Sequence, residues 1–454
     1  MRKAFKAYDI RGIFDVDFTA NDVYRIGFFL PQLLNADKVL IGMDVRLSSQ
    51  TIFENLSKGI TDAGADVHFC GLATTPMIYW ATARFSYDAS VMITASHNPS
   101  KYNGLKISRK EALPVGYDSG LSNLLELAEN GTIKTVGKKG NIIDFSFRHE
   151  YLQFLKPYIT DLSTLKIAVD CSNGMSSLLV KEILGHSPIY LFDTMDGTFP
   201  NHEPNPLEPE NVKDLSKCVV DNKCDLGVIF DGDADRVMFV DEQGTFIQPD
   251  MMIAVLSDYF AGKDESGRSI QDIRTSKSVT EYVESRGFEM HTWRVGRAYA
   301  ALKLREINGL FGGELAGHYY FRDFYYSDSA FLAALILLSE IKKAKDKVIT
   351  VSQLISGISS YYGSGEINLH IADKVAAMDA LVGRMKLAEV PTKIMDFDGY
   401  RIEFADWWFN IRPSNTEPYL RLILEARTPE LLREKLDTAL KILEPFKNPE
   451  EHGH

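Results

Sequence analysis

Residues 38–63 read KVLIGMDVRLSSQTIFENLSKGITDA. The first part, Lys38–Val45, is a short apolar run that ends in polar residues, and it predicts a buried strand. The second part, Ser48–Ala63, has apolar residues at helical spacing and predicts an amphipathic helix. A strand that is followed at once by a helix is the building unit of α/β domains with parallel strands.

The same strand-then-helix plan returns further along the chain. Leu165–Asp170 precedes an expected helix at Gly174–Leu184, and Ser269–Ile273 precedes another at Ser278–Arg286. Units that recur at intervals of about a hundred residues predict a duplicated α/β domain with mixed, mostly parallel sheets. The copies share little residue identity, so the repeat is one of structure.

The last ninety or so residues follow a different plan. Strands are expected at Tyr400–Ile411 and Tyr419–Glu425 around a short loop, and a charged helix at Pro429–Leu443 closes the segment. This order is typical of an α+β domain. The predicted fold class is therefore α/β, with three similar α/β domains and a smaller C-terminal α+β domain.

Three polar or glycine-bearing stretches are candidate domain junctions, because linkers favour such residues. They are Asp144–Arg148, Gln248–Asp250 and Gly363–Glu366. The expected domains are residues 1–147, 148–250, 251–364 and 365–454.

Size and charge exclude several classes of protein. The 454 residues carry 50 Lys and Arg against 62 Asp and Glu, a formal net charge of −12. The chain is too long for a single small binding module and has room for three or four domains. The acidic balance, with no basic tail, argues against nucleic acid and anionic membranes as partners, because clustered Lys and Arg hold a phosphate backbone.

Cysteine use and hydropathy indicate a reducing compartment. Cys70, Cys171, Cys218 and Cys224 form no CxxC pair, which predicts buried free thiols rather than disulfides or a thiolate zinc site. The first residues, MRKAFKAYDIRGIFD, lack the apolar core of a signal peptide, and the longest apolar run, Phe331–Leu338, is too short to span a bilayer. We expect a cytoplasmic location.

The segment DGDADR, residues 231–236, lies between two apolar runs and should form a loop at a strand end. In locally extended backbone alternate residues share a side, so Asp231, Asp233 and Asp235 would aim three carboxylates at one point. Such a cluster repels itself unless a cation lies within it, and Mg²⁺ suits oxygen ligands. A hairpin turn rich in Asp and Gly is the structural alternative. An EF-hand is rejected, because Arg236 stands at its sixth position instead of Gly.

The segment TASHNP, residues 94–99, follows the apolar run Ala89–Ile93. Ser96 is expected on an exposed turn, where its hydroxyl can reach a ligand, although a turn without function is the alternative. A Ser-His-acid hydrolase is disfavoured, because the surrounding sequence is not GxSxG and His97 is adjacent to Ser96. The hydroxyl is thus left without an obvious activator.

Two further loops carry polar groups suited to a sugar phosphate. RPSNTEP, residues 412–418, joins two strands, and Arg421 follows it; the guanidinium, hydroxyl and amide groups suit a phosphate. GGELAGH, residues 312–318, carries one carboxylate and one imidazole that can bind hydroxyl groups. The alternatives are a polar hairpin loop and a flexible turn, respectively.

With these segments in this order, the chain resembles the α-D-phosphohexomutases, most closely the bacterial phosphomannomutase/phosphoglucomutase enzymes. The resemblance extends over essentially the full length. AYDIRG at residues 7–12 is similar to the N-terminal signature of the family, and YNGLK at 102–106 to the segment after its phosphoserine loop. TASHNP resembles the phosphoserine loop, DGDADR the metal loop, GELAGH the sugar loop and RPSNTEP the phosphate-binding loop.

The resemblance implies a role for each matched residue. Ser96 would carry a phosphoryl group, and a phosphoserine oxygen would join Asp231, Asp233 and Asp235 in holding Mg²⁺. The residues implied to line the phosphoserine are Arg11, Lys106 and Arg236. Those implied to contact the substrate are Glu314 and His318 at sugar hydroxyls, and Arg412, Ser414, Asn415, Thr416 and Arg421 at the phosphate.

Two positions depart from the family pattern. Ala316 stands where the family often has Ser, so one hydrogen bond to the sugar is lost. Arg297 stands where many members have His. An arginine binds phosphate well but is a poor proton shuttle, because its pKa exceeds about 12.

The implied activity is that of a Mg²⁺-dependent isomerase, which interconverts hexose 6-phosphate and hexose 1-phosphate through a phosphoserine. Hexose 1,6-bisphosphate would be intermediate and activator, with mannose preferred and glucose accepted. Leu315, in place of the Gln typical of phosphoglucosamine mutases, argues against glucosamine. A phosphoglucosamine mutase, a metal-dependent sugar phosphatase and a noncatalytic sugar-phosphate sensor are the alternatives. The expected partners are small sugar phosphates, and no oligomeric state is assigned.

Overall fold

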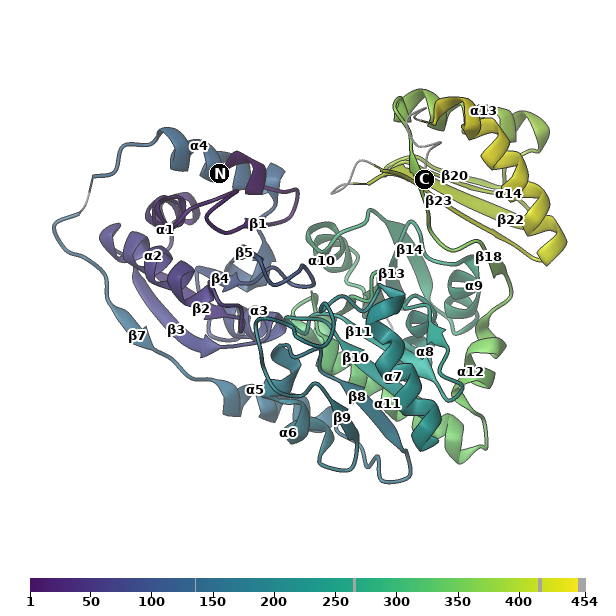
Figure 1. Cartoon of the computed structure of the whole chain (residues 1–454), viewed down its shortest axis with the longest axis horizontal. Coiled ribbons are helices and arrows are strands. Elements are labelled where there is room, and N and C mark those ends of the chain that lie inside the picture. Colours follow the sequence, from purple (N-terminus) through teal and green to yellow (C-terminus); the bar gives the residue numbers. More distant parts are fainter. Residues whose placement is uncertain (135, 264–266, 415–418, 448–454) are drawn as a thin grey trace.

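Four β-sheets follow one another along the chain in the computed structural model, which describes residues 1–134, 136–263, 267–414 and 419–447. Figure 1 shows the first and fourth sheets in separate lobes, with the second and third sheets between and below them. No helix within the described ranges is long and apolar enough to cross a bilayer. The fold class predicted from the sequence is confirmed.

The first sheet has seven strands in the order β1-β5-β4-β2-β3-β7, with β6 against β5. Its centre is parallel, from β4 through β2 and β3 to β7, whereas β5 runs antiparallel to its neighbours. The strands are β1 Ile10–Ile13, β2 Lys38–Met43, β3 Asp66–Leu72, β4 Ala89–Ile93, β5 Tyr102–Arg109, β6 Leu113–Pro114 and β7 Ile142–Asp144. The helices are α1 Ala20–Leu34, α2 Ser49–Asp62, α3 Thr75–Arg84, α4 Leu121–Asn130 and α5 Arg148–Leu155.

The second and third sheets repeat the centre of the first. Their orders are β9-β8-β10-β11-β12 and β14-β13-β15-β16-β17, each with three parallel strands followed by two antiparallel ones. The second comprises β8 Ile167–Asp170, β9 Ile189–Leu191, β10 Leu226–Phe230, β11 Val237–Asp241 and β12 Phe246–Ile247, with α6 Val180–Leu184 and α7 Pro209–Asn222. The third comprises β13 Arg268–Asp272, β14 Glu289–Trp293, β15 Phe311–Gly313, β16 Tyr319–Phe321 and β17 Ser327–Asp328. Its helices are α8 Met251–Phe260, α9 Lys277–Ser285, α10 Arg297–Glu306, α11 Ala330–Asp346 and α12 Val351–Ile358.

The fourth sheet is antiparallel throughout, in the order β18-β23-β22-β21-β20 with β19 against β23. Its strands are β18 Tyr362–Gly363, β19 Ile367–His370, β20 Lys393–Met395, β21 Tyr400–Glu403, β22 Trp407–Pro413 and β23 Tyr419–Ala426, and its helices are α13 Lys374–Ala388 and α14 Pro429–Leu443. The prediction of a single strand at Tyr400–Ile411 is wrong. The segment forms two strands joined by a tight turn, in which Phe404 N bonds Trp407 O.

The helix expected at Gly174–Leu184 is also broken, into a 3₁₀ turn at Met175–Leu178 and the short α6. The break lies at Leu179, whose φ of −127° is not helical, and Met175 N at the start of the segment donates to Gly232 O of the acidic loop. Other 3₁₀ turns lie at Arg2–Ala4, Lys110–Ala112, Tyr117–Ser119, Lys156–Tyr158, Arg322–Phe324 and Glu444–Phe446.

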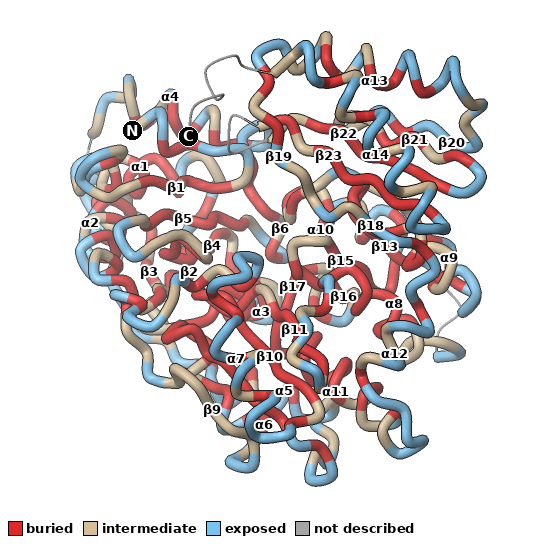
Figure 2. The backbone as a smooth tube through the Cα atoms, turned by 45° about the vertical axis from the view of Figure 1, so that its right-hand side comes forward, coloured by how far each residue is buried: buried red, intermediate tan, exposed pale blue. Residues whose placement is uncertain are grey.

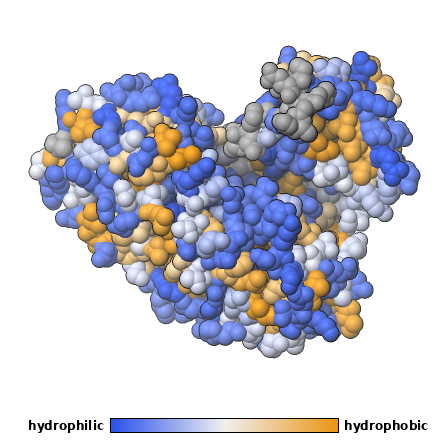
Figure 3. All heavy atoms as spheres, in the orientation of Figure 1, coloured by the Kyte–Doolittle hydropathy of each residue, from blue (hydrophilic) through white to orange (hydrophobic). Residues whose placement is uncertain are grey.

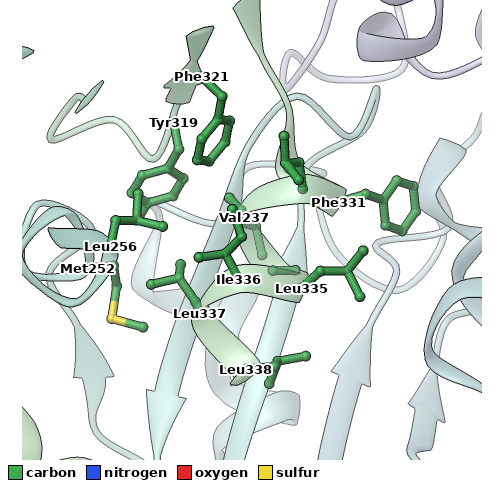
Figure 4. Close-up of a cluster of buried hydrophobic side chains, with 14 of the residues drawn as sticks. Val237, Met252, Leu256, Tyr319, Phe321, Phe331, Leu335, Ile336, Leu337 and Leu338 are labelled. Carbon is green, nitrogen blue, oxygen red and sulfur yellow. The ribbon is translucent and has the colours of Figure 1, made fainter. Parts of the chain in front are cut away.

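The largest core spans the second and third sheets and reaches β2, β4 and α3 of the first domain, and Figure 4 shows part of it. The apolar run Phe331–Leu338 lies within α11, is buried throughout, and shares its cluster with Val237 of β11 and Tyr319 of β16. Such all-round burial explains a helix whose apolar residues show no single stripe. Figure 2 shows the backbone coloured by burial, with buried segments in the interior of the molecule and exposed segments at its edge. Two of the four cysteines, Cys70 and Cys218, are only partly buried, so the expectation of four buried thiols is half right.

Candidate active site

Three loops that occupy the same place in the three repeated sheets form the centre of the site. In each sheet the loop joins the third parallel strand to the antiparallel strand beside it. The three loops are the one that contains Ser96, after β4, the one that contains Asp231, after β10, and the one that contains Glu314, after β15. Ligands of α/β sheets bind outside the carboxyl ends of the parallel strands, which is where these loops lie.

Direct contacts join the three loops. Arg236 and His318 form an isolated antiparallel bridge between the second and third loops. Gly232 approaches the first loop so closely that a Cβ there would lie 2.6 Å from Ser96 O. Only glycine can occupy this position without moving one of the loops.

Ser96 is buried, with 1% of its surface exposed, so the expected exposed turn is wrong. The residue has a left-handed φ of 51°, its N bonds Thr94 Oγ1 at 2.9 Å, and its Oγ donates to Asp231 Oδ2 at 3.0 Å. The second domain covers a turn that the sequence of the first domain alone would leave open. The hydroxyl therefore faces the acidic loop.

Among the described residues, the neighbouring His97 has no carboxylate on its Nδ1, unlike the histidine of a Ser-His-acid hydrolase. Burial lowers the pKa of His97 well below its ordinary value, and the nearby cations Arg236 and Arg11 lower it further. Within the described part of the chain, its buried Nδ1 has no hydrogen-bond partner. This agrees with the exclusion of a Ser-His-acid triad from the sequence.

Asp231, Asp233 and Asp235 converge, with one carboxylate oxygen of each within 4.8 Å of the others. The backbone is a tight turn, with Ala234 at a φ of 58°, rather than the extended segment expected. Asp231 Oδ1 accepts from the N–H groups of Asp235 and Arg236, at 3.2 and 3.1 Å, and these bonds close the turn. The convergence was predicted correctly, but its cause is the turn and not strand alternation.

Lys106 of β5 supplies a positive charge to this cluster. Its Nζ lies 2.7 Å from Asp233 Oδ2 and 2.5 Å from Asp235 Oδ2. Burial opposes the charged lysine, but the two carboxylates raise the pKa of Lys106 well above its ordinary value. Thr75, at the start of α3, also donates to Asp233 Oδ2, at 2.5 Å.

The carboxylates differ in their electrostatics. Burial raises the pKa of Asp231 well above its usual range, and Asp235 and Asp233 add to this shift. Burial acts in the same direction on Asp235, but Lys106 and His318 outweigh it and lower the pKa of Asp235. A cation among these groups would favour the ionised form of all three.

The donor set fits a divalent cation that prefers oxygen ligands. Asp233 Oδ1 and Asp235 Oδ1 are buried and lack hydrogen-bond partners in the ranges that the structure describes. Buried carboxylate oxygens without a partner are costly, and a cation bound by them would remove this cost. Hard oxygen ligands of this kind suit Mg²⁺.

The two other cations expected near Ser96 contact the Ser96 loop and the acidic loop, respectively. Arg11 ion-pairs with Asp9 and donates to Asn98 Oδ1 at 2.9 Å, next to the Ser96 loop. Arg236 Nε donates to His318 Nε2 at 3.0 Å and lies 3.8 Å from Asp231 Oδ2.

The sugar-loop residues are buried and held by their own partners. Glu314 Oε1 accepts from Gly296 N and from the Tyr320 hydroxyl, both at 3.1 Å. Burial raises the pKa of Glu314 above its ordinary value. His318 Nδ1 lies 2.7 Å from Asp328 Oδ2, so that Asp328 can orient the imidazole.

Arg297, at the start of α10, pairs with Asp328 at 3.1 Å, and its guanidinium carbon lies 3.4 Å from the centre of the Tyr79 ring. The pKa of Arg297 is raised: burial opposes the charge, but Tyr79 and Asp328 outweigh that effect. It is a fixed charge rather than a proton carrier.

The phosphate-loop residues belong to the fourth sheet. Arg412 of β22 is 2% exposed and donates to Asp398 Oδ1 at 3.2 Å, and Arg421 of β23 pairs with Glu366 at 3.1 Å. Ser414 follows β22, whereas the expected residues Asn415 and Thr416 lie outside the described residues. Figure 3 shows the surface hollowed between the lobe of the first sheet and that of the fourth.

One positioning residue, Arg46, was missed from the sequence. Its buried guanidinium donates to four carbonyl groups of the Ser96 loop, at 2.6–3.1 Å: those of Ser96, Asn98, Pro99 and Tyr102. The sequences of the repeated α/β domains contain a signal that could have identified Arg46. Asp44-x-Arg46, just after β2, recurs as Asp272-x-Arg274 at the end of β13, and in both the carboxylate accepts the backbone N–H of the arginine.

Four family models match the chain in order. They describe the phosphoglucomutase/phosphomannomutase alpha/beta/alpha domains I, II and III, at residues 2–131, 149–244 and 248–361, and the C-terminal domain, at residues 366–441. The phosphomannomutase of Methanocaldococcus jannaschii is 36% identical, over 95% of this chain and 96% of its own. That of Escherichia coli K12 is also 36% identical, over 93% and 94%.

Solved structures agree with these matches. A phosphoglucomutase/phosphomannomutase family protein from Burkholderia thailandensis superposes with a TM-score of 0.86 and 27% identity, over 99% of both chains. Parafusin, a phosphoglucomutase from Paramecium, has the same fold in its open form, with a TM-score of 0.77 and 17% identity over 95% of this chain and 92% of its own.

Proposed function

Because the chain belongs to the phosphoglucomutase/phosphomannomutase family and is thus a phosphohexomutase, an isomerase, we propose that it interconverts hexose 6-phosphate and hexose 1-phosphate through a phosphoserine at Ser96. Hexose 1,6-bisphosphate is the intermediate and activator. Mannose is the preferred sugar and glucose is accepted, a choice supported by the activity for which the relatives are named. The observation that carries the proposal is the buried contact of 3.0 Å between Ser96 Oγ and Asp231 Oδ2, within a cluster suited to a divalent cation.

Each half-reaction moves one phosphoryl group. In the first, the bond from phosphorus to Ser96 Oγ breaks and a bond from phosphorus to a sugar hydroxyl oxygen forms. The hydroxyl loses its proton and Ser96 Oγ gains one. After the sugar turns over, the phosphoryl group at its other end returns to Ser96 by the reverse steps, so atoms and charge balance over the cycle.

Phosphoryl transfer needs positioned charge more than covalent chemistry. Bound Mg²⁺, held by Asp231, Asp233, Asp235 and an oxygen of phosphorylated Ser96, would neutralise charge on the phosphoryl oxygens. Lys106, Arg11 and Arg236 line the same group as fixed cations.

The remaining residues hold the substrate in both orientations. Glu314 and His318 bind sugar hydroxyls, and Arg297 contributes a fixed positive charge. Arg412, Ser414, Asn415, Thr416 and Arg421 bind the phosphate distal to Ser96. A phosphate site on a separate domain can bind the distal phosphate whichever end of the sugar faces Ser96. Closure of that domain would exclude water.

We also propose the domain boundaries 1–147, 148–250, 251–364 and 365–454. The first two ranges each contain one whole sheet, which supports the boundaries at 147/148 and 250/251. The third range holds the third sheet and also β18, Tyr362–Gly363, which pairs with β23 of the fourth sheet, so the last boundary cuts off one strand of that sheet. The cytoplasmic location, and the absence of nucleic-acid and membrane partners, stay predictions.

A coupled assay tests this function. Mannose 1-phosphate, glucose 1-phosphate and glucosamine 1-phosphate are supplied separately, and both the 6-phosphate product and free phosphate are measured. We expect turnover of the first two without phosphate release. Release without isomerisation would indicate a phosphatase, and preference for the third would indicate a phosphoglucosamine mutase.

The Ser96→Ala variant tests the phosphoserine. It should abolish turnover, and mass analysis should find a phosphoryl group on the wild-type peptide that contains Ser96 and none on that of the variant. Ser100→Ala is the matched control, because Ser100 is exposed on the same loop. A near-normal rate in Ser96→Ala would exclude the phosphoserine mechanism.

A further inference from the structure

The loop at residues 294–297, between β14 and α10, connects separate parts of the molecule. Val295 O accepts from the Tyr8 hydroxyl of the first domain at 2.9 Å, and Gly296 N donates to Glu314 of the sugar loop at 3.1 Å. Gly296 has a φ of 119°, and a Cβ there would lie 2.6 Å from the Tyr8 ring. The loop is thus fixed against both neighbours. In Figure 1, α10 lies between the ribbons of the first and fourth domains.

Asp398 joins this loop to the fourth domain. Its Oδ2 accepts from Val295 N at 2.9 Å, and its Oδ1 accepts from Arg412 Nη2 at 3.2 Å. The Asp398 side chain is 12% exposed and that of Arg412 is 2% exposed. Gly399, which follows, has a φ of 68° and lies so close to Arg412 that a Cβ would come within 2.5 Å of it. The backbone therefore holds the Asp398 carboxylate against the arginine.

The carboxylate satisfies Arg412 only in part. Arg412 Nε is buried and has no hydrogen-bond partner among the residues that the structure describes. A guanidinium can bind an anion through two parallel N–H groups, and a phosphate dianion offers more charge and more acceptor oxygens than one carboxylate. A phosphate could thus make the bond that Asp398 does not.

We propose that Asp398 is a positioning residue that holds Arg412 and Val295 together when no phosphate is bound, and that the distal phosphate of the substrate takes its place on Arg412. This inference rests on the proposed function only in taking Arg412 as a phosphate ligand. The exchange frees Val295 N, and so loosens the link between the loop at 294–297 and the fourth domain. When the phosphate leaves, Asp398 returns, and the buried arginine is never left without an anion.

The exchange has a measurable consequence for affinity. When a ligand binds only the molecules in which its site is open, the apparent Kd equals the intrinsic Kd divided by the fraction of molecules with an open site. If the Asp398 carboxylate occupies Arg412 in most molecules, the Asp398→Asn variant should bind phosphate about tenfold more tightly than wild type. KM should fall with it. The bisphosphate must also release Arg412 to turn over, and without Asp398 that release is slower, so kcat should fall as well.

The experiment measures binding by calorimetry in chelator, with inorganic phosphate and glucose 1-phosphate as probes, beside the mutase assay. Asp396→Asn is the matched control, because it removes the same charge from an exposed residue of the same loop. Asp398→Glu should keep an affinity close to that of wild type. In the Arg412→Ala background, Asp398→Asn should change neither affinity nor rate, because the group for which carboxylate and phosphate compete is gone.

Tighter binding with lower kcat in Asp398→Asn alone supports the proposal. Unchanged or weaker binding in that variant, when wild type binds both probes and turns over sugar phosphate, overturns it and leaves the proposed function standing. Wild type that binds neither probe and has no mutase activity refutes the proposed function, and the inference with it.

Trp293 provides a readout in the wild-type protein, should the variant fail to fold. Its ring lies 5.3 Å from that of Phe397, the residue before Asp398, so the pair spans the contact in question. Phosphate should change the Trp293 emission with the half-saturation found by calorimetry, and Trp293→Phe provides the blank. Saturation with phosphate without any change in this emission would contradict the exchange.

Discussion

Replacing Lys106 by Met should make the stability of the protein depend on a divalent cation. The Lys106 ammonium lies 2.7 and 2.5 Å from the carboxylates of Asp233 and Asp235, both of which are fully buried. Removing one partner of a buried ion pair leaves an uncompensated charge and costs about 3–5 kcal/mol. Methionine fills a similar volume, so loss of packing adds little. In chelator we therefore expect the free energy of unfolding to fall by about 3–5 kcal/mol.

A cation bound by the same carboxylates should replace most of this lost charge. In saturating Mg²⁺ the deficit of Lys106→Met relative to wild type should shrink to about 1 kcal/mol, because the carboxylates are again neutralised. Urea unfolding and thermal melts of both proteins, each in chelator and in Mg²⁺, measure this difference. Lys101→Met is the control, since Lys101 is an exposed lysine on the adjacent turn.

Two results would refute this reasoning. A Lys106→Met variant as stable as wild type in chelator would mean that the lysine does not compensate the acidic cluster. A deficit of the same size in Mg²⁺ and in chelator would mean that a bound cation does not replace the charge of Lys106.

Three further predictions follow from buried charges. Asp233→Asn should leave the unfolding free energy in chelator within about 1 kcal/mol of wild type, because Lys106 still pairs with Asp235, whereas thermal melts should show most of the Mg²⁺-induced stabilisation lost. Arg46→Lys should lower kcat about tenfold or more with little change in KM, because a single ammonium cannot hold four carbonyl groups and the Ser96 loop loses its position; steady-state kinetics test this. Burial raises the pKa of Asp250 to about 7, so the folded state binds more protons than the unfolded state between about pH 4 and 7, and stability falls as pH rises through that window. Asp250→Asn should remove this slope. In urea unfolding, the free energy of unfolding of the variant relative to wild type should rise by up to about 4 kcal/mol between pH 4 and pH 8.

Local pattern was enough for most of the elements. The helix α14 has the predicted bounds, Pro429–Leu443. In the structure Thr428 caps it and Pro429 occupies its first turn, and both are local signals. The strand β2 and the helix α2 were also predicted to within two residues at each end. These signals depend on neighbouring residues along the chain, so the sequence carries them in full.

Some errors arose where distant parts of the chain intervene. The segment Gly174–Leu184 has a helical pattern, but its backbone leaves the helical range at Leu179, and its start at Met175 is bonded to the acidic loop of the same domain. The error at Tyr400–Ile411 has a local cause: the segment mixes apolar and polar residues, and its pattern alone does not show that Phe404–Trp407 is a turn. Ser96 has the local sequence of an exposed turn, and a different domain buries it.

The sequence by itself determined the repeated strand-and-helix units, the loops at strand ends and the residue types that each loop carries, because these depend on spacing and side-chain chemistry. Only the tertiary structure decided that the three loops are equivalent, that they meet at Ser96 and that Lys106 lies between two of the carboxylates. It also decided which anion faces each arginine, as Asp398 does at Arg412. The physical reason is range: these contacts join residues more than a hundred positions apart, or side chains whose partners depend on how whole sheets pack.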